Sequence, residues 1–134
     1  MSRMTGDNAR RGALLLGGAL AALCCATGAQ AQESDTASDE IVVTKTTDSA
    51  LTGTNLRLIL SNLGIRTVIC VGIFTDQCIA STVRSLADES FDVVVLDDCC
   101  AAATDALHRR ELEIINMIYC NVMTLSDLKA LMRL

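Results

Sequence analysis

A single cysteine stands where an apolar run gives way to a helical pattern. Cys78 follows the run 67–71 (TVICV) and precedes residues 79–90, whose apolar positions recur at helical spacing. In the first turn of a helix the backbone N–H groups and the helix dipole favour an anion, which lowers the pKa of a thiol. Cys78 is therefore a candidate nucleophile, and the alternative is a small buried apolar side chain.

Further polar residues follow two other apolar runs. Lys45 comes directly after residues 41–44 (IVVT), and Asp97 and Asp98 come after residues 91–96 (FDVVVL). In a parallel sheet the carboxyl ends of the strands meet at one edge, where ligands bind. A cation, a thiol and carboxylates at one edge are the parts of a nucleophilic site.

Each of these polar residues also has an ordinary explanation. Lys45 can be a solvated lysine at the end of a strand. Thr75 and Asp76, just ahead of the cysteine, can contact a substrate, although Asp76 can equally cap the helix. His108 is the only histidine and invites a Cys–His pairing, but its charged neighbours on a helix favour a surface or supporting role.

The cysteine spacing argues against metal and disulfide frameworks. Cys70 lies inside an apolar run and is expected in the core, and Cys99 and Cys100 are expected to pack rather than to do redox work. After residue 31 the chain holds five cysteines, an odd number without C-x-x-C spacing, so we expect neither a disulfide framework nor a structural zinc site. We also expect no other metal and no cofactor. Such thiols suit a reducing compartment.

Apolar runs alternate with helical patterns along residues 41–134, which predicts βαβ units and a parallel sheet covered by helices on both faces, a three-layer α/β/α fold. Thr104 and Asp105 suit the start of one helix, and Ser126 suits the cap of the last. The predicted strands are 41–44, 67–71, 91–96 and 121–125, and the predicted helices are 55–63, 79–90, 104–119 and 126–134.

The N-terminus reads as a leader. Three arginines precede 21 uncharged residues, 12–32, which are rich in Leu, Ala and Gly. We expect residues 1–31 to be a signal peptide cleaved after Ala31, with an uncleaved membrane anchor as the alternative. Residues 32–40 read as an acidic linker. A functional leader implies a secreted or periplasmic protein, and otherwise a cytoplasmic one; only an uncleaved leader would contact the membrane.

The net charge of the chain after residue 31 limits the classes of partner that it is expected to bind. Three of the 11 Lys and Arg and one of the 16 Asp and Glu lie in residues 1–31, so the remainder carries a net charge of −7. Nucleic acids and anionic membranes both reward a basic face, so neither is an expected partner.

Three segments in order resemble the isochorismatase-like cysteine hydrolases, which include nicotinamidases and ureidoacrylate and biuret amidohydrolases. Residues 72–84 (GIFTDQCIASTVR) resemble their nucleophile segment. Residues 45–51 (KTTDSAL) are similar to the family's Lys-x-x-x-Ser-Ala/Gly-Phe segment, with Leu51 in place of Phe. The third is the segment 93–108, and the resemblance as a whole covers about residues 41–130.

The resemblance implies a role for individual residues. Cys78 matches the nucleophile that forms a thioester-type acyl intermediate, and Lys45 matches the lysine that keeps it anionic. The Ile73–Phe74 peptide matches a non-proline cis bond, and the backbone N–H groups of Phe74 and Cys78 match an oxyanion hole. The implied reaction is hydrolysis of a C–N bond in a small amide or ureide.

The chain also departs from the family. The family's third catalytic residue is an Asp on its first strand, in an Asp-x-Gln segment that this sequence lacks. Asp35, Asp39 and Glu40 lie in the linker and match nothing. We therefore expect impaired hydrolysis by a truncated member of the family, with a non-catalytic binding or oligomer-completing subunit as the alternative.

The family's sheet has the strand order 3-2-1-4-5-6, and residues 41–44 would correspond to its third strand. The N-terminal strands are thus expected to be missing. Residues 41–44 must then pair directly with residues 67–71, or an apolar edge stays open. A second copy of the chain could complete the sheet, so we expect a homo-oligomer.

Overall fold

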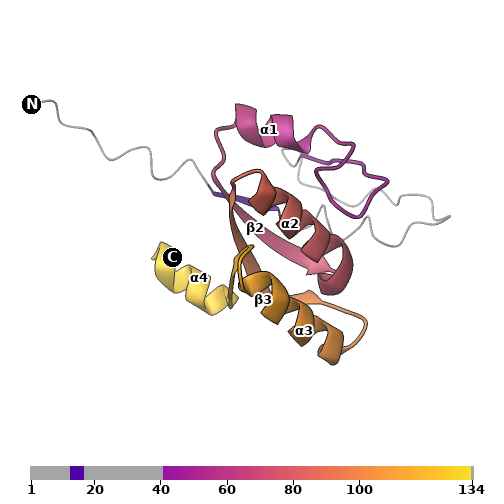
Figure 1. The fold of residues 1–134 in the computed structure, drawn as a ribbon. Helices are drawn as coiled ribbons and strands as arrows, with labels where there is room; N and C mark the ends of the chain where they lie inside the picture. Colours follow the sequence, from indigo (N-terminus) through magenta and orange to yellow (C-terminus); the bar gives the residue numbers. More distant parts are fainter. Residues whose placement is uncertain (1–12, 17–40, 134) are drawn as a thin grey trace, which may run out of the picture.

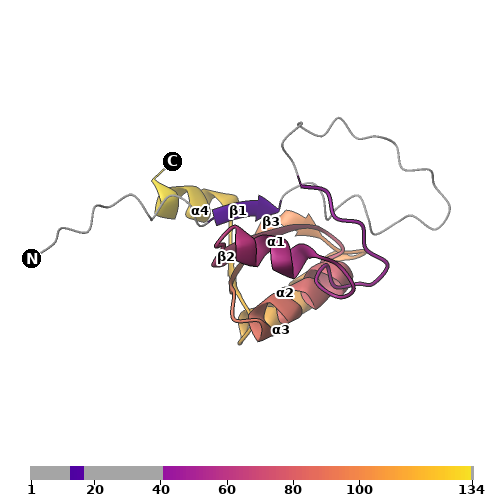
Figure 2. The same ribbon diagram turned by 90° about the horizontal axis from the view of Figure 1, so that it is seen from above.

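The computed structural model describes residues 13–16 and 41–133, in which four parallel strands form one sheet of order β1-β2-β3-β4 (Figure 1). Figure 2 shows α1, α2 and α3 on one face of this sheet and α4 on the other, which confirms the predicted three-layer α/β/α fold. The elements are β1 (Ala13–Leu16), α1 (Leu56–Asn62), β2 (Thr67–Ile73), a π-helical turn, η3 (Thr75–Ile79), α2 (Ala80–Asp88), β3 (Asp92–Ala101), α3 (Asp105–Asn116), β4 (Asn121–Met123) and α4 (Leu125–Met132).

Strand β2 is apolar on both faces because both faces are covered. Val68 and Cys70 belong to the buried cluster formed with α1, α2 and α3, whereas Ile69 packs with Leu128 of α4 on the opposite face. All three β2 side chains are at most 2% exposed. A strand buried on both faces needs a continuous apolar run rather than an alternating one, as residues 67–71 provide.

The partner of β2 at its outer edge differs from the prediction. Residues 41–44 form neither helix nor strand, and Ile41 and Val42 are exposed. Residues 13–16 instead form β1, which pairs in parallel with β2. The predicted pairing of 41–44 with 67–71 is therefore wrong. A short apolar run becomes a strand only where an edge is available to it, because strand propensity depends on context.

The rest of the predicted leader, 1–31, and all of the linker, 32–40, lie outside the described residues. Their roles as signal peptide and linker stay predictions. Among the residues that the structure does describe, no helix is both long and apolar enough to cross a membrane.

Strand β3 is longer than predicted and irregular. It continues past residue 96 to Ala101, so Asp97 and Asp98 lie within the strand and not after it. Cys70 of β2 pairs with Val95, but Gly72 pairs with Cys100, which marks a bulge in β3. A bulge of this kind redirects side chains near the end of a strand.

The caps of the last two helices rest on threonines. Thr104 caps α3 as predicted, and its hydroxyl accepts a hydrogen bond from the backbone N–H of Leu107. The prediction of Ser126 as the cap of α4 is wrong, because the helix begins at Leu125. Thr124 and Asp127 form a reciprocal capping box at that end.

The contribution of the capping box to stability depends on pH. The side-chain and backbone hydrogen bonds from Thr124 lower the pKa of the Asp127 carboxyl. A depressed folded-state pKa stabilises the fold above the unfolded-state pKa, and this contribution is lost as the pH falls through the folded-state value.

We predict that Thr124→Ala lowers the free energy of unfolding by about 1 kcal/mol, because one N-cap hydrogen bond to the backbone is lost. Urea unfolding at pH 7 measures the change. Ser126→Ala, at an exposed position within the same helix, is the matched control and is expected to change little. An equal loss in both variants would contradict the assignment of the cap to Thr124.

Candidate active site

The candidate nucleophile lies at the carboxyl end of β2. The peptide bond between Ile73 and Phe74 is cis, at the position that the resemblance implies. The turn η3 follows, and the backbone N–H groups of Gln77 and Ile79 donate hydrogen bonds to the carbonyl oxygen of Phe74. Cys78 is 4% exposed within this turn, which runs directly into α2. The turn thus holds Cys78 where the strand ends and the helix begins.

The cysteines of the described part of the chain differ in state. Cys78 is disulfide-bonded in the structure, and a sulfur in that state is not a nucleophile, so thiolate chemistry at this position requires the reduced chain. Burial raises the pKa of Cys70 to about 12 and those of Cys100 and Cys120 to about 11. These three thiols stay protonated at neutral pH, which suits a packing role.

The segment 45–51 is fixed on the helix that follows the nucleophile. The backbone N–H of Ala50 donates to the Thr82 hydroxyl at 3.0 Å, and the Ser49 hydroxyl donates to that of Ser85 at 2.8 Å. Ser49 and Ala50 are buried. Two contacts to α2 therefore set the position of this segment beside η3.

This segment brings a carboxylate to the sulfur. Oδ1 of Asp48 lies 4.0 Å from Sγ of Cys78. Nζ of Lys45 donates a hydrogen bond to the backbone oxygen of Thr47 at 2.7 Å, so its ammonium group lies along its own segment. The sequence analysis named Lys45 and missed Asp48. The one feature of the sequence that could have pointed to Asp48 is its place as a carboxylate at a variable position of the Lys-x-x-x-Ser segment.

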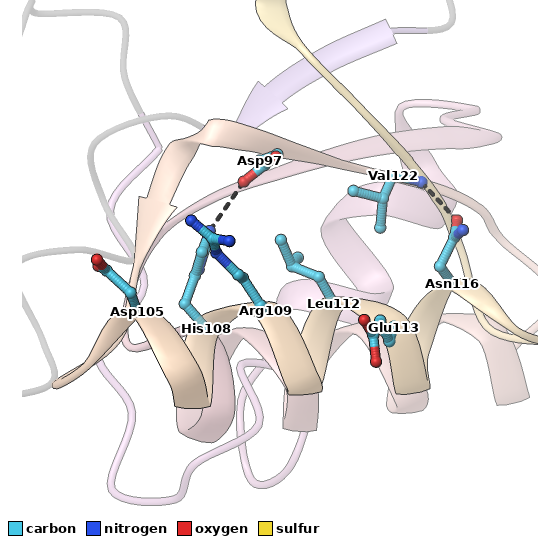
Figure 3. A pocket seen from close by; sticks show the side chains of 8 residues that line it. All are labelled: Asp97, Asp105, His108, Arg109, Leu112, Glu113, Asn116 and Val122. Carbon is cyan, nitrogen blue, oxygen red and sulfur yellow. Dashed lines mark hydrogen bonds and ion pairs between the residues drawn. The ribbon is translucent and has the colours of Figure 1, made fainter.

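His108 ties α3 to the turn that carries Cys78. Its Nδ1 lies 2.8 Å from the Thr75 hydroxyl, and its Nε2 lies 2.8 Å from Oδ1 of Asp97 (Figure 3). With the proton on Nε2, the neutral ring donates to Asp97 and accepts from Thr75. Thr75 is fully buried, so its hydroxyl is occupied inside the protein. His108 therefore has a supporting role and is not paired with the cysteine.

The two neighbouring aspartates of β3 diverge. Asp97 reaches His108 on one side of the sheet, whereas Oδ1 of Asp98 accepts the backbone N–H of Leu125 at 2.9 Å, at the start of α4. The expectation that both carboxylates belong with the thiol to one site therefore fails for Asp98, which bonds the start of α4 instead. The bulge in β3 and the alternation of side chains along a strand separate them.

Asp76 has an oxygen without an internal partner. Its Oδ1 is buried and, among the described residues, accepts no hydrogen bond. An unsatisfied buried acceptor costs free energy unless something outside these residues satisfies it.

A cavity of about 620 Å³ adjoins the His108–Asp97 pair (Figure 3). It lies between α3 and strands β3 and β4, and Cys78 is not among its lining residues. Within the described parts of the chain, no group of three His, Cys, Asp or Glu side chains could hold a metal ion.

Residues 13–127 match the isochorismatase domain. The chain belongs to the isochorismatase family. The match includes β1, so the family domain begins before residue 41, where the sequence resemblance was expected to begin.

Several members of the isochorismatase family are similar to this chain. Isochorismatase family protein YrdC from Bacillus subtilis is 36% identical over 64 residues, covering 48% of this chain and 34% of that protein. An isochorismatase-like hydrolase from Alkaliphilus metalliredigens is 30% identical with a TM-score of 0.70, covering 72% of this chain and 53% of that one. Nicotinamidase PncA from Bacillus subtilis is 28% identical with a TM-score of 0.57, covering 59% and 44%.

These comparisons confirm the family resemblance and the α/β fold. The chain spans about a third of its curated relative YrdC and about half of the solved hydrolase from Alkaliphilus metalliredigens.

We predict that His108→Ala lowers the free energy of unfolding by about 1–3 kcal/mol, because the buried Thr75 hydroxyl loses its partner. Urea unfolding measures the change. Arg109→Ala, at the exposed neighbouring position, is the control and should stay within about 0.5 kcal/mol of the parent chain. A His108→Ala chain as stable as the control would show that the bond to Thr75 contributes nothing.

Proposed function

We propose that this chain is a cysteine hydrolase that cleaves a C–N bond of a small amide or ureide through an acyl intermediate on Cys78. The observation that carries the proposal is the position of Cys78, in the turn η3 between β2 and α2, at the carboxyl end of a buried strand. The chain's membership of the isochorismatase family supports a hydrolytic reaction. Similarity to a nicotinamidase supports an amide as the substrate.

The reaction begins with the reduced thiol of Cys78, which gives up its proton as the sulfur attacks. Sγ of Cys78 attacks the carbonyl carbon, an S–C bond forms, and the carbonyl electrons move to oxygen. The backbone N–H groups of Phe74 and Cys78 are the proposed donors to this oxyanion. Its collapse breaks the C–N bond, and the nitrogen leaves with the proton that the thiol gave up. Water then attacks the thioester, releasing the carboxylic or carbamic acid and the thiol.

Two charged side chains have proposed supporting roles. Lys45 lies three residues before Asp48 on the anchored segment, and rotation of its long side chain away from Thr47 would bring a positive charge toward the thiolate. Asp76 carries a buried oxygen that accepts no hydrogen bond among the described residues, which suits it to accept an N–H of the substrate.

We predict that the reduced full-length chain hydrolyses at least one member of a panel of amides and ureides, measured as released ammonia or amine, and that Cys78→Ser reduces the rate to background. Cys99→Ser is the matched control and should retain activity. The pKa of the Cys99 thiol is raised, mainly by burial and further by the neighbouring Asp98 carboxylate, so this thiol is a poor nucleophile.

Alkylation by iodoacetamide at pH 7, read by mass spectrometry, adds an independent result. Fast labelling at Cys78 with slow labelling at Cys70 and Cys100 is expected from an activated thiol. Slow labelling at Cys78 would overturn its role as nucleophile. Fast labelling without hydrolysis of any substrate would overturn the hydrolase and favour a non-catalytic binding subunit.

A further inference from the structure

We propose that Asp48 is the acid–base carboxylate of this site. The inference rests on the proposed hydrolase function and deepens it, because it supplies the group that the Asp-x-Gln segment would otherwise provide. After β1 the sequence contains no Asp or Glu before Glu33. Asp48 instead comes from the segment between β1 and α1, and its Oδ1 lies 4.0 Å from Sγ of Cys78.

The backbone around Asp48 is held on both sides. The Thr47 hydroxyl donates to the carbonyl oxygens of Ser49 and Thr52, both at 2.9 Å. On the other side, Ser49 and Ala50 are bonded to α2. Asp48 is itself exposed. A fixed backbone with an exposed side chain gives a carboxylate that stays beside the sulfur and can still exchange protons with substrate and water.

The other carboxylates near the turn have different environments. Asp97 is bonded to His108, and Asp98 to the start of α4. Asp76 belongs to the same turn as the cysteine, and its Oδ1 is buried and accepts no hydrogen bond among the described residues. Among the described residues, Asp48 is thus the carboxylate that both contacts Sγ and is exposed to solvent.

In the reduced chain, a carboxylate at this distance from Sγ allows a balanced proton cycle. The Asp48 carboxylate takes the proton of the Cys78 thiol as the S–C bond forms, and gives it to the nitrogen as the C–N bond breaks. It then takes a proton from the water that attacks the thioester and returns it to the departing thiolate. Amide and water are consumed, acid and amine are released, and both side chains return to their starting states. A contact of 4.0 Å without substrate is compatible with this role, because such bonds shorten in the substrate complex.

We predict that Asp48→Asn lowers kcat/KM by about 10²- to 10⁴-fold, the usual contribution of a general acid–base group. Labelling of Cys78 by iodoacetamide should persist, and its pH midpoint should fall, because removal of the neighbouring negative charge favours the thiolate. A merely structural role would reduce hydrolysis and labelling together. Asp88→Asn, at an exposed position at the end of α2, is the matched control and should leave both unchanged.

The two measurements separate the possible failures. Full activity in Asp48→Asn would overturn the role of Asp48 while leaving the hydrolase intact. An unchanged pH midpoint of labelling would show that Asp48 does not act on the sulfur, whether or not a substrate has been found. A parent chain that is labelled at Cys78 and hydrolyses nothing overturns the proposed function, and with it a catalytic role for Asp48. Asp76→Asn should raise KM more than it lowers kcat, and the opposite split would make Asp76 the acid–base group.

Discussion

Burial of β2 on both faces is the constraint on which the other features depend. Because its side chains alternate between two buried clusters, helices must cover the sheet from both sides. Its backbone polar groups must also be paired along both edges, by β1 and β3. The carboxyl end of the strand then has little freedom. Because η3 directly follows this strand, the position of the turn and of Cys78 is fixed by the burial of β2.

The candidate site is assembled from two separate segments, each of which contacts a residue of this turn. The segment before α1 brings Asp48 to the sulfur and is fastened to α2 by hydrogen bonds from Ser49 and Ala50. From α3, His108 is bonded to Thr75 inside the turn. Each contact costs conformational entropy that the surrounding packing must offset. The site is preorganised because the irregular segment that carries Asp48 is bonded to α2, and because His108 is held on α3.

The parts of the fold that follow from local rules could be predicted from the sequence. The apolar run 67–71 and the helix capped by Thr104 are examples, because their signals lie within a few residues. The edge strand could not be predicted in this way. Residues 13–16 and 41–44 are both short apolar runs, and pairing with β2 decided between them.

The site shows the same division. The place of Cys78 between strand and helix was readable from sequence, as was the supporting role of His108. The separation of Asp97 from Asp98 depends on a register shift between two strands, which no local pattern announces. Asp48 was hidden for a different reason. Its closeness to the sulfur comes from a tertiary contact between segments 30 residues apart.

The bulge in β3 makes the contacts of Asp97 and Asp98 dependent on the number of residues in this part of the strand. Between the pairs Cys70–Val95 and Gly72–Cys100, β2 contains only residue 71, whereas β3 contains residues 96–99. Within that stretch, adjacent carboxylates serve opposite layers, one holding His108 and the other the start of α4. Deleting Leu96 would shift both carboxylates by one position relative to the paired residues 92–95 and turn each toward the opposite face, which would break both contacts. Relatives that keep both contacts must therefore conserve the number of residues in this stretch more strictly than their identities.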